Sequence, residues 1–229
     1  MRVLGLVPAR GGSLRVERKN LIELDGRTLV RRALETSLAA GCFAQVAVSS
    51  DDPEILAEAP AGVVRIDRPP ALASATSRTL DAVLHALDTL DDDFDAVGIV
   101  QATSPFTAAE DLAKAVAMLE RSGAASVVSV VRVDAALHPL KLKVMVGERV
   151  HPWLADDAMA PSHELPELWV RNGSVYLTRV ETLRRGQILD ESDQVGYVMP
   201  PERSHDIDTP QDLAFARFLL GSGTIKWPR

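Results

Sequence analysis

Segments with the apolar pattern of buried strands alternate with segments of helical periodicity along most of this 229-residue chain. The run Val-Leu-Gly-Leu-Val at residues 3–7 predicts a buried strand. In residues 28–40 leucine and alanine recur on one helical face, and Gly41 ends the pattern. The same reasoning predicts further strands at residues 43–49, 63–66, 96–100, 125–133 and 174–178, and helices at residues 78–90, 108–120 and 209–220. Residues 51–54 are predicted to begin a further, short helix, with a proline near its first position. Strands separated by helices indicate an α/β fold with a mostly parallel sheet.

The first strand is followed by a loop that is rich in glycine and in positive charge, residues 8–20. Gly11 and Gly12 carry no Cβ, so the backbone there can approach a ligand closely and point its amides into one concavity. Four cations flank these glycines: Arg10, Arg15, Arg18 and Lys19. Backbone N–H groups beside Arg and Lys are the donors that a polyphosphate requires. The spacing fits neither the P-loop nor the dinucleotide-binding glycine pattern, so the sequence predicts a triphosphate-binding loop of another type.

The distribution of charge is informative. A net charge of −7 argues against general nucleic-acid binding. Residues 1–32 contain eight Lys and Arg against three acidic residues, a local net of +5, so the rest of the chain carries −12. A basic region on an acidic body is typical of a small anionic ligand bound at one site. Alternatively, Arg27, Arg31 and Arg32 merely line the solvated face of their helix.

The composition narrows the class of protein. An apolar content of 46% supports a full-sized core, which at this length means one large domain or one domain with an insertion. No apolar run approaches the roughly 18 residues of a membrane span, and the chain starts on a strand pattern rather than on a secretory signal. Cys42 is the only cysteine, which excludes an internal disulfide. We therefore expect a soluble, cytoplasmic protein without a membrane or nucleic-acid partner.

The alternation stops between residues 137 and 169, which contain four prolines and no clear helical pattern. A structureless segment of this length inside a compact domain is unusual. We expect instead a hairpin arm that packs on a second subunit. The predicted organisation is a nucleotide-binding domain formed by residues 1–136 and 171–229, with residues 137–170 as a dimerisation arm.

Two carboxylates at positions i and i+2, Asp206 and Asp208, precede the last predicted helix. In an extended segment they point to the same side, and both could ligate Mg²⁺. Such a pair alone more often serves solubility or helix capping. Its presence on the same chain as a phosphate-binding loop favours a metal site, because nucleotidyl transfer requires Mg²⁺ to neutralise the phosphates.

Polar residues also follow a predicted strand at Gln101–Pro105. The carboxyl ends of parallel strands are where α/β proteins bind ligands, so Gln101 is a candidate substrate contact, although Thr103 or Ser104 could simply cap the next helix. Asn172-Gly173 ordinarily marks a tight turn, and only its context suggests a site.

Together these segments resemble the acylneuraminate cytidylyltransferases, which make CMP-sialic acid and its bacterial relatives CMP-legionaminate and CMP-pseudaminate. The family's loop signature, A-R-x-G-S-K-x-x-P-x-K-N, corresponds to residues 9–20. The other matching motifs, in chain order, are R-P-x-x-L-A at residues 68–73, Q-P-T-S-P at 101–105, H-P-L-K at 138–141, N-G-[AS]-I-Y at 172–176 and D-I-D-T-x-x-D-L at 206–213. Several short motifs in the correct order are far more specific than any one of them.

This resemblance implies a Rossmann-like, three-layer nucleotidyltransferase fold, a homodimer joined through the protruding arm, CTP as co-substrate and Mg²⁺ as cofactor. It implies that an acceptor hydroxyl attacks the α-phosphate of CTP and that pyrophosphate leaves. The implied catalytic residues are Arg10, Lys19 and Asp208, and the metal ligands are Asp206 and Asp208. The implied CTP-binding residues are Ala9, Arg10, Gly11, Gly12, Ser13, Asn20, Arg68 and Thr79. The implied contacts to an acidic small-molecule acceptor are Gln101, Ser104, Lys141 and Asn172.

The chain also departs from the family pattern. Leu14 replaces the loop lysine, with Arg15 beside it as a candidate substitute, and Glu17 replaces a proline. Ala75 replaces an aspartate, and Ser162 replaces the arginine of P-R-Q-x-L-P on the arm. These differences leave three hypotheses: transfer of CMP to a nonulosonic, sialic-type sugar acid; transfer to another acidic acceptor, such as a phosphonate or a different ulosonic acid; and an inactive nucleotide-binding paralogue.

Overall fold

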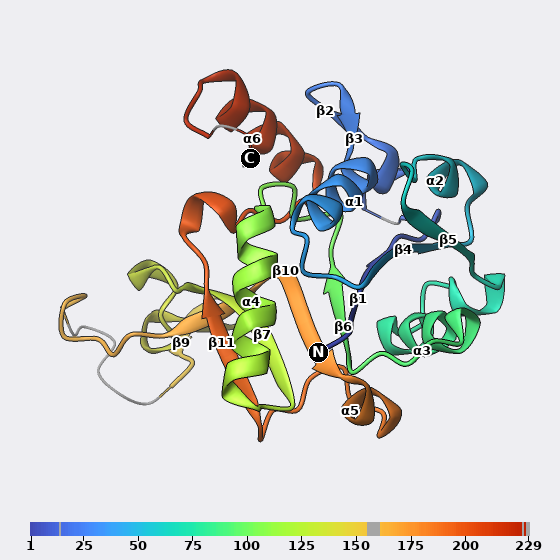
Figure 1. Ribbon diagram of the computed structural model, residues 1–229. Coiled ribbons are helices and arrows are strands. Elements are labelled where there is room, and N and C mark those ends of the chain that lie inside the picture. Colours follow the sequence, from blue (N-terminus) through green and yellow to red (C-terminus); the bar gives the residue numbers. More distant parts are fainter. Residues whose placement is uncertain (14, 155–160, 226, 228–229) are drawn as a thin grey trace.

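A seven-stranded sheet forms the centre of the protein (Figure 1). The computed structural model describes residues 1–13, 15–154, 161–225 and 227. The strands lie in the order β11-β7-β10-β6-β1-β4-β5. Their bounds are β1 Val3–Pro8, β4 Gln45–Ser50, β5 Val63–Asp67, β6 Ala96–Val100, β7 Ser126–Arg132, β10 Trp169–Arg179 and β11 Gln194–Val198. All neighbours are parallel except β10, which runs antiparallel to both β6 and β7. The predicted α/β fold with a mostly parallel sheet is confirmed.

Helices cover both faces of this sheet (Figure 1). Their bounds are α1 Leu29–Ala39, α2 Pro53–Ala57, α3 Thr79–Leu90, α4 Ala109–Ser122, α5 Val180–Arg184 and α6 Pro210–Gly221. The side chains of β1 alternate between two hydrophobic clusters: Val3 and Val7 pack with α1 and α4, and Leu4 and Leu6 pack with α3 and α5. The result is a three-layer arrangement. Among the described residues, no helix has both the length and the hydropathy that crossing a membrane would require.

The strand and helix predictions agree with the structure to within a few residues at each end, but four elements were missed. These are the small hairpin of β2 (Glu23–Leu24) and β3 (Arg27–Thr28), the short helix α5 and the edge strand β11. The turn suggested at Asn172-Gly173 is wrong. Both residues lie inside β10, where the pairing register with β7 shifts between Arg171 and Tyr176 and Gly173 has a φ of +82°. The dipeptide therefore makes a bulge, which bends one strand instead of joining two.

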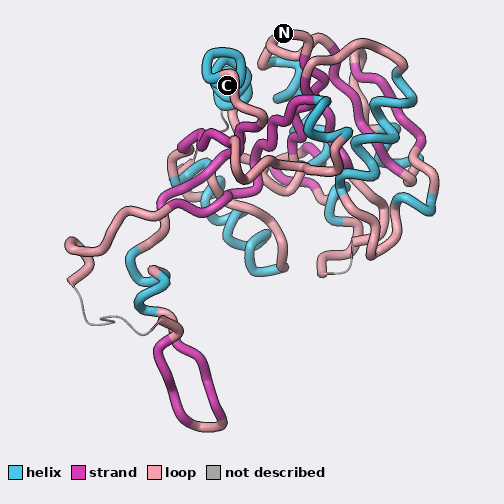
Figure 2. Tube along the Cα trace, turned by 90° about the horizontal axis from the view of Figure 1, so that it is seen from below, coloured by secondary structure: helices cyan, strands magenta, loops and turns pink. Residues whose placement is uncertain are grey.

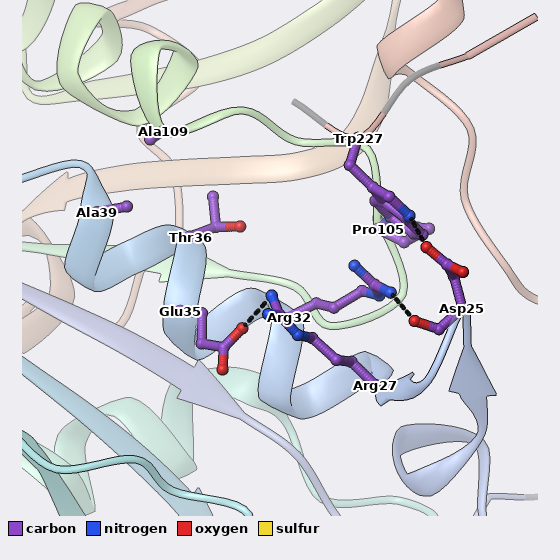
Figure 3. A pocket seen from close by; sticks show the side chains of 9 residues that line it. All are labelled: Asp25, Arg27, Arg32, Glu35, Thr36, Ala39, Pro105, Ala109 and Trp227. Atoms are coloured by element: carbon purple, nitrogen blue, oxygen red, sulfur yellow. Dashed lines mark hydrogen bonds and ion pairs between the residues drawn. The ribbon is translucent and has the colours of Figure 1, made fainter. Parts of the chain in front are cut away.

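The solvated face suggested for the first helix is wrong at Arg32, which is 8% exposed. Its guanidinium donates to the carbonyl of Leu24. It lies 3.4 Å from the centre of the Trp227 ring, and Figure 3 shows the two side chains next to each other. The Trp227 indole N–H in turn donates to Asp25 at 2.6 Å. Trp227, which follows α6, lies over Arg32 of α1, and no local pattern in the helix could indicate this contact. The pocket of about 380 Å³ beside this contact has paired charges of both signs on its wall, among them Arg27 with Glu35.

Between β7 and β10, the described residues extend away from the sheet, as Figure 2 shows. Strands β8 (Lys143–Val146) and β9 (Arg149–Pro152) form a separate two-stranded hairpin that extends away from the rest of the chain. Every residue of both strands is exposed, including the apolar Met145, Val146 and Val150. The described part of the arm thus has a hairpin but almost no core of its own.

Candidate active site

Two adjoining cavities lie beyond the carboxyl ends of β1 and β6. The larger has a volume of about 860 Å³ and the smaller about 270 Å³. Both are lined by Arg78, Thr79, Ile99 and Gln101, so they form two compartments of one site. This edge of a parallel sheet is where α/β proteins place ligands. The predicted site residues Thr79 and Gln101 lie at the boundary between the compartments.

The smaller cavity contains two predicted arginines, Arg10 and Arg68. Arg10 donates to the carbonyl of Ser74 at 2.8 Å. Arg68 is 5% exposed and donates to the carbonyl of Ser49 at 2.8 Å, whereas its Nε has no hydrogen-bond partner among the described residues. Burial lowers the pKa of Arg68. A cation of this kind with a free donor favours an electron-rich polar ligand.

The glycine-rich loop packs against the residues that follow β4. The amide of Gly11 donates to the Asp51 carboxylate at 3.0 Å, and a Cβ at Gly11 would lie 2.9 Å from side-chain atoms of Asp52. Only glycine fits this close approach. Farther along the loop, Asn20 donates from its amide to the carbonyl of Arg10 at 2.9 Å, which ties the two ends of the loop together. Ser13 lies within the described residues, and Leu14 lies outside them.

The loop reaches the carboxylate pair through Lys19. Its Nζ lies 3.0 Å from Oδ1 of Asp208, and Nη1 of Arg15 lies 2.9 Å from Oδ2 of the same carboxylate. The hydrogen bond from Lys19 is the main reason that the pKa of Asp208 lies below its usual range. Residues far apart in the sequence thus meet at one point, as the loop and the acidic motif together had suggested.

Asp206 lies in a different environment from Asp208. Burial is the main cause of its raised pKa, and the charge of Asp208 adds to it. Its Oδ1 is buried and has no hydrogen-bond partner among the described residues. The absence of a side chain at Gly173 leaves room beside it, because a Cβ there would lie 3.6 Å from the Asp206 carboxylate. A buried carboxylate oxygen without a partner fits a cation ligand.

The segment that carries both carboxylates is fixed at its centre and its end. The amide of Ile207 donates to the carbonyl of Thr103 at 2.8 Å, which joins it to the loop after β6. At its end, Thr209 caps α6 and Asp212 accepts from the amides of Asp208 and Thr209, at 3.0 and 2.8 Å. This capping arrangement holds the backbone of Asp208 in place.

The larger cavity is lined by four predicted residues, Thr79, Gln101, Asn172 and Asp206. The amide of Asn172 donates to Ser204 at 2.9 Å and to the sulfur of Met199 at 3.2 Å, and its oxygen accepts from Ser129 at 2.6 Å. These bonds fix the β10 bulge. Buried Ser104 has a hydroxyl without a partner among the described residues, 3.4 Å from where a Cβ of Gly173 would lie.

Lys141 is a predicted site residue for which the described part of the structure shows no contact with this group. It is on the arm, where it donates to Ser162 at 2.8 Å, and within the described residues it lines neither cavity. Conversely, the cavities include Arg78, Arg171 and Tyr176, which were not predicted as site residues. Arg78 adjoins the predicted Thr79, and Arg171 adjoins Asn172. The sequence could therefore have indicated Arg78 and Arg171 only through the predicted site residues next to them.

A three-layer α/β fold that joins a cationic, glycine-rich loop to a carboxylate pair defines a nucleotidyltransferase. A comparison with protein families matches residues 4–155 to the family described as cytidylyltransferase. The chain belongs to this cytidylyltransferase family and is a CTP-dependent nucleotidyltransferase. The resemblance found in the sequence motifs is thereby confirmed.

Individual relatives agree with this assignment. The chain is 30% identical over 226 residues to the CMP-N,N'-diacetyllegionaminic acid synthase of Legionella pneumophila, covering 96% of this chain and 97% of that protein. It is 25% identical over 228 residues to a pseudaminic acid cytidylyltransferase of Campylobacter jejuni, covering 96% of each. Among solved structures, a CMP:2-keto-3-deoxy-manno-octonic acid synthetase complexed with CTP has the same fold. The TM-score is 0.72 at 17% identity, over 97% of this chain and 100% of the other.

Proposed function

We propose that this protein transfers CMP from CTP to a nonulosonic, sialic-type sugar acid and releases pyrophosphate. The observation that carries the proposal is the contact between the glycine-rich loop and the acidic motif, through the Lys19–Asp208 pair at 3.0 Å, beside a cavity of about 860 Å³. The full-length similarity to two synthases of CMP-activated nonulosonic acids supports the choice of acceptor.

In this proposal the smaller cavity binds the nucleoside of CTP. Arg68 supplies its free Nε from the cavity wall, Thr79 lies beside it, and Asn20 supports the loop from behind. Arg10 and Lys19 provide positive charge for the triphosphate, together with the loop amides and Ser13. Fixed donors of this kind stabilise the charge that develops on the phosphates during transfer.

The carboxylates Asp206 and Asp208 would hold Mg²⁺. They fit that ion because both are hard oxygen donors and Asp206 has a buried oxygen without a partner among the described residues. Among the described residues, no group of three or more Asp, Glu, His or Cys side chains is arranged so that it could hold a metal ion, and one or two carboxylates plus substrate phosphates are a common Mg²⁺ environment. When bound, the ion would neutralise the phosphates and the departing pyrophosphate.

The transfer itself is a single displacement. The hydroxyl oxygen of the sugar acid forms a bond to the α-phosphorus and loses its proton, the bond from that phosphorus to the bridging oxygen breaks, and pyrophosphate leaves with the electron pair. Gln101 lies at the boundary of the two cavities, so it is placed to contact the acceptor near the reacting atoms. The protein contributes mainly positioning and charge stabilisation.

The acceptor would occupy the larger cavity. Arg78 and Arg171 both line it, and each can pair with a carboxylate. Asn172 completes the polar wall. Ser104 is buried behind it, next to Gly173, and Lys141 would approach from the arm. Ser162 leaves the arm one arginine short of the family pattern, so a different acidic acceptor, such as a phosphonate or another ulosonic acid, is the alternative.

Release of pyrophosphate from CTP and Mg²⁺ tests this proposal. We expect turnover with at least one nonulosonic acid, such as legionaminic, pseudaminic or N-acetylneuraminic acid, and at least about tenfold faster with CTP than with UTP, ATP or GTP. The panel also includes 3-deoxy-manno-octulosonic acid and phosphonates. Turnover with only 3-deoxy-manno-octulosonic acid or a phosphonate would favour the alternative acceptor. No turnover with any pair would favour an inactive nucleotide-binding protein.

We also propose that the arm joins two copies of the chain. Its hairpin exposes apolar side chains on both strands, among them Met145 and Val150 at 61% and 58%. An exposed apolar surface of this kind is typical of an interface. The sheet near β11 has a further cavity, of about 560 Å³, that is lined partly by exposed Trp169 and Val198.

A charge placed on the hairpin is expected to weaken this dimer. Met145→Asp would bury a carboxylate in an apolar contact, and we expect at least about a tenfold rise in the dimer dissociation constant, measured by sedimentation equilibrium. The matched control is Ala61→Asp, an exposed site just before β5 at the opposite edge of the sheet. Unchanged dimerisation of Met145→Asp, or a monomeric wild type, would refute the role of the arm.

For location we propose the cytoplasm. Cys42 is the only cysteine of the chain, and burial raises the pKa of its thiol to about 11. Such a thiol is poorly reactive, and a chain without disulfides suits a reducing compartment.

A further inference from the structure

Two cationic side chains form ion pairs with Asp208, one of the proposed metal ligands. Lys19 and Arg15 each pair with a different oxygen of Asp208, at 3.0 and 2.9 Å. The two cations differ in their freedom: the side chain of Lys19 is 14% exposed and that of Arg15 is 68% exposed. Lys19 also begins a short 3-10 turn, Lys19–Leu21, whereas Arg15 lies in the irregular part of the loop.

Asp206, the other proposed metal ligand, is not paired in this way. Within the described residues no cation forms an ion pair with it, and its Oδ1 has no hydrogen-bond partner. The two carboxylates of the proposed metal site are therefore unequal. One is available to a cation, and the other is already paired at both oxygens.

The pairing of Asp208 has a consequence for metal binding. A divalent cation at Asp208 must either displace the guanidinium and the ammonium or bind beside two positive charges, and both routes weaken it. The same two groups are the donors that a triphosphate attracts. Arg15 contacts Asp208 through Nη1 alone, so turning this nitrogen toward a phosphate gives up the contact with Asp208.

We propose that Arg15 is an exchangeable ion-pair partner of Asp208. Arg15 pairs with this carboxylate in the absence of nucleotide and pairs with the triphosphate when CTP binds, and the carboxylate is then free to bind the divalent cation. Nucleotide and metal binding are then coupled through Arg15, and by linkage each promotes the other. Arg15 is better suited to this exchange than Lys19 because its long side chain is mostly exposed. The inference rests on the proposed function for the identity of the nucleotide.

The proposal predicts opposite effects of one substitution. Arg15→Gln removes this ion-pair partner, so Mn²⁺, used as a spectroscopic probe in place of Mg²⁺, should bind the nucleotide-free protein roughly three- to tenfold more tightly. The same variant loses a phosphate donor, so CTP in EDTA should bind roughly three- to tenfold more weakly. Mn²⁺ binding is measured by electron paramagnetic resonance and CTP binding by calorimetry, both on the full chain.

Arg18→Gln is the matched control. Arg18 lies in the same loop and carries the same charge, but it pairs with Glu54 at 2.6 Å instead of Asp208. It should change each affinity by less than about twofold, since removing an exposed charge acts only weakly at a distance. Arg15→Lys keeps the charge and should return both affinities toward those of the wild type.

Three results would overturn the proposal: unchanged Mn²⁺ affinity in Arg15→Gln, weaker Mn²⁺ binding in that variant, or equal effects of Arg15→Gln and Arg18→Gln. Thermal melting of each variant shows whether a loss of folding explains a change. The proposed function fails separately, if the wild-type protein releases no pyrophosphate from CTP with any acceptor. In that case, tighter Mn²⁺ binding and weaker CTP binding by Arg15→Gln would still support the role of Arg15.

Discussion

Asp208→Asn is expected to lower kcat about a thousandfold or more, which corresponds to about 4 kcal/mol of lost transition-state stabilisation. The amide has nearly the same size, but it lacks the negative charge that would hold Mg²⁺ and that pairs with Lys19 and Arg15. Because the Asp208 side chain is 44% exposed, losing these ion pairs should cost less than about 1 kcal/mol of folding stability.

The measurement is pyrophosphate release at saturating CTP, Mg²⁺ and acceptor, with thermal melting as the check on folding. Asp88→Asn is the matched control, because Asp88 also forms an ion pair, with Arg184 at 2.7 Å, but lies on α3 away from the carboxylate pair. It should keep wild-type activity. If Asp208→Asn retained more than about a tenth of wild-type kcat, the proposed metal role of Asp208 would be wrong.

The layers of the fold were predictable because strong periodicity depends on local sequence. The apolar run of β1 and the one-sided leucines of α1 indicate their structures without any knowledge of neighbours. The same holds for the start of α6, where Thr209, Pro210 and Asp212 are together sufficient to specify a capped helix. The capping box in the structure confirms it.

The direction of β10 was not predictable, because it depends on the return of the chain from the arm. Residues 174–178 have the apolar pattern of a buried strand in either direction. For the same reason Asn172-Gly173 suggested a turn, although pairing with both β6 and β7 converts it to a bulge. Arg32 is a third case, since it is covered by Trp227 from the far end of the chain.

The candidate site likewise has parts that the sequence predicts and parts that it does not. Its loop and its carboxylate pair carry recognisable residue types at short spacing, and the structure brings them together through Lys19 and Asp208. The residues that bind the backbone of these two segments are not marked as their partners by any recognisable motif. Asp51, which binds the amide of Gly11, and Thr103, whose carbonyl accepts from Ile207, come from strand ends that only the folded sheet places nearby.

A buried carboxylate at the start of α4, Asp111, supports the site from behind and was also not predicted. It is 0% exposed, accepts from Nε and Nη2 of Arg203 at 2.9 and 2.8 Å and from the hydroxyl of Tyr197 at 2.9 Å. It also caps its own helix by accepting from the amide of Ala108 at 2.9 Å. Burial is the main cause of the raised pKa of Tyr197, so this hydroxyl stays protonated and keeps donating. Arg203 lies directly before the segment that carries Asp206.

Asp111→Ala is therefore expected to destabilise the protein by about 3 kcal/mol, because it leaves a cation and a hydroxyl without their buried acceptor and removes a helix cap. For a chain of this length that corresponds to a fall of about 10 °C in the melting temperature. Urea unfolding measures the free energy directly. Glu110→Ala is the matched control: Glu110 is the adjacent residue, is 53% exposed and lies 3.4 Å from the same Arg203, so it should cost less than about 1 kcal/mol. Equal losses in the two variants would mean that the buried network around Asp111 contributes no more to stability than a surface ion pair.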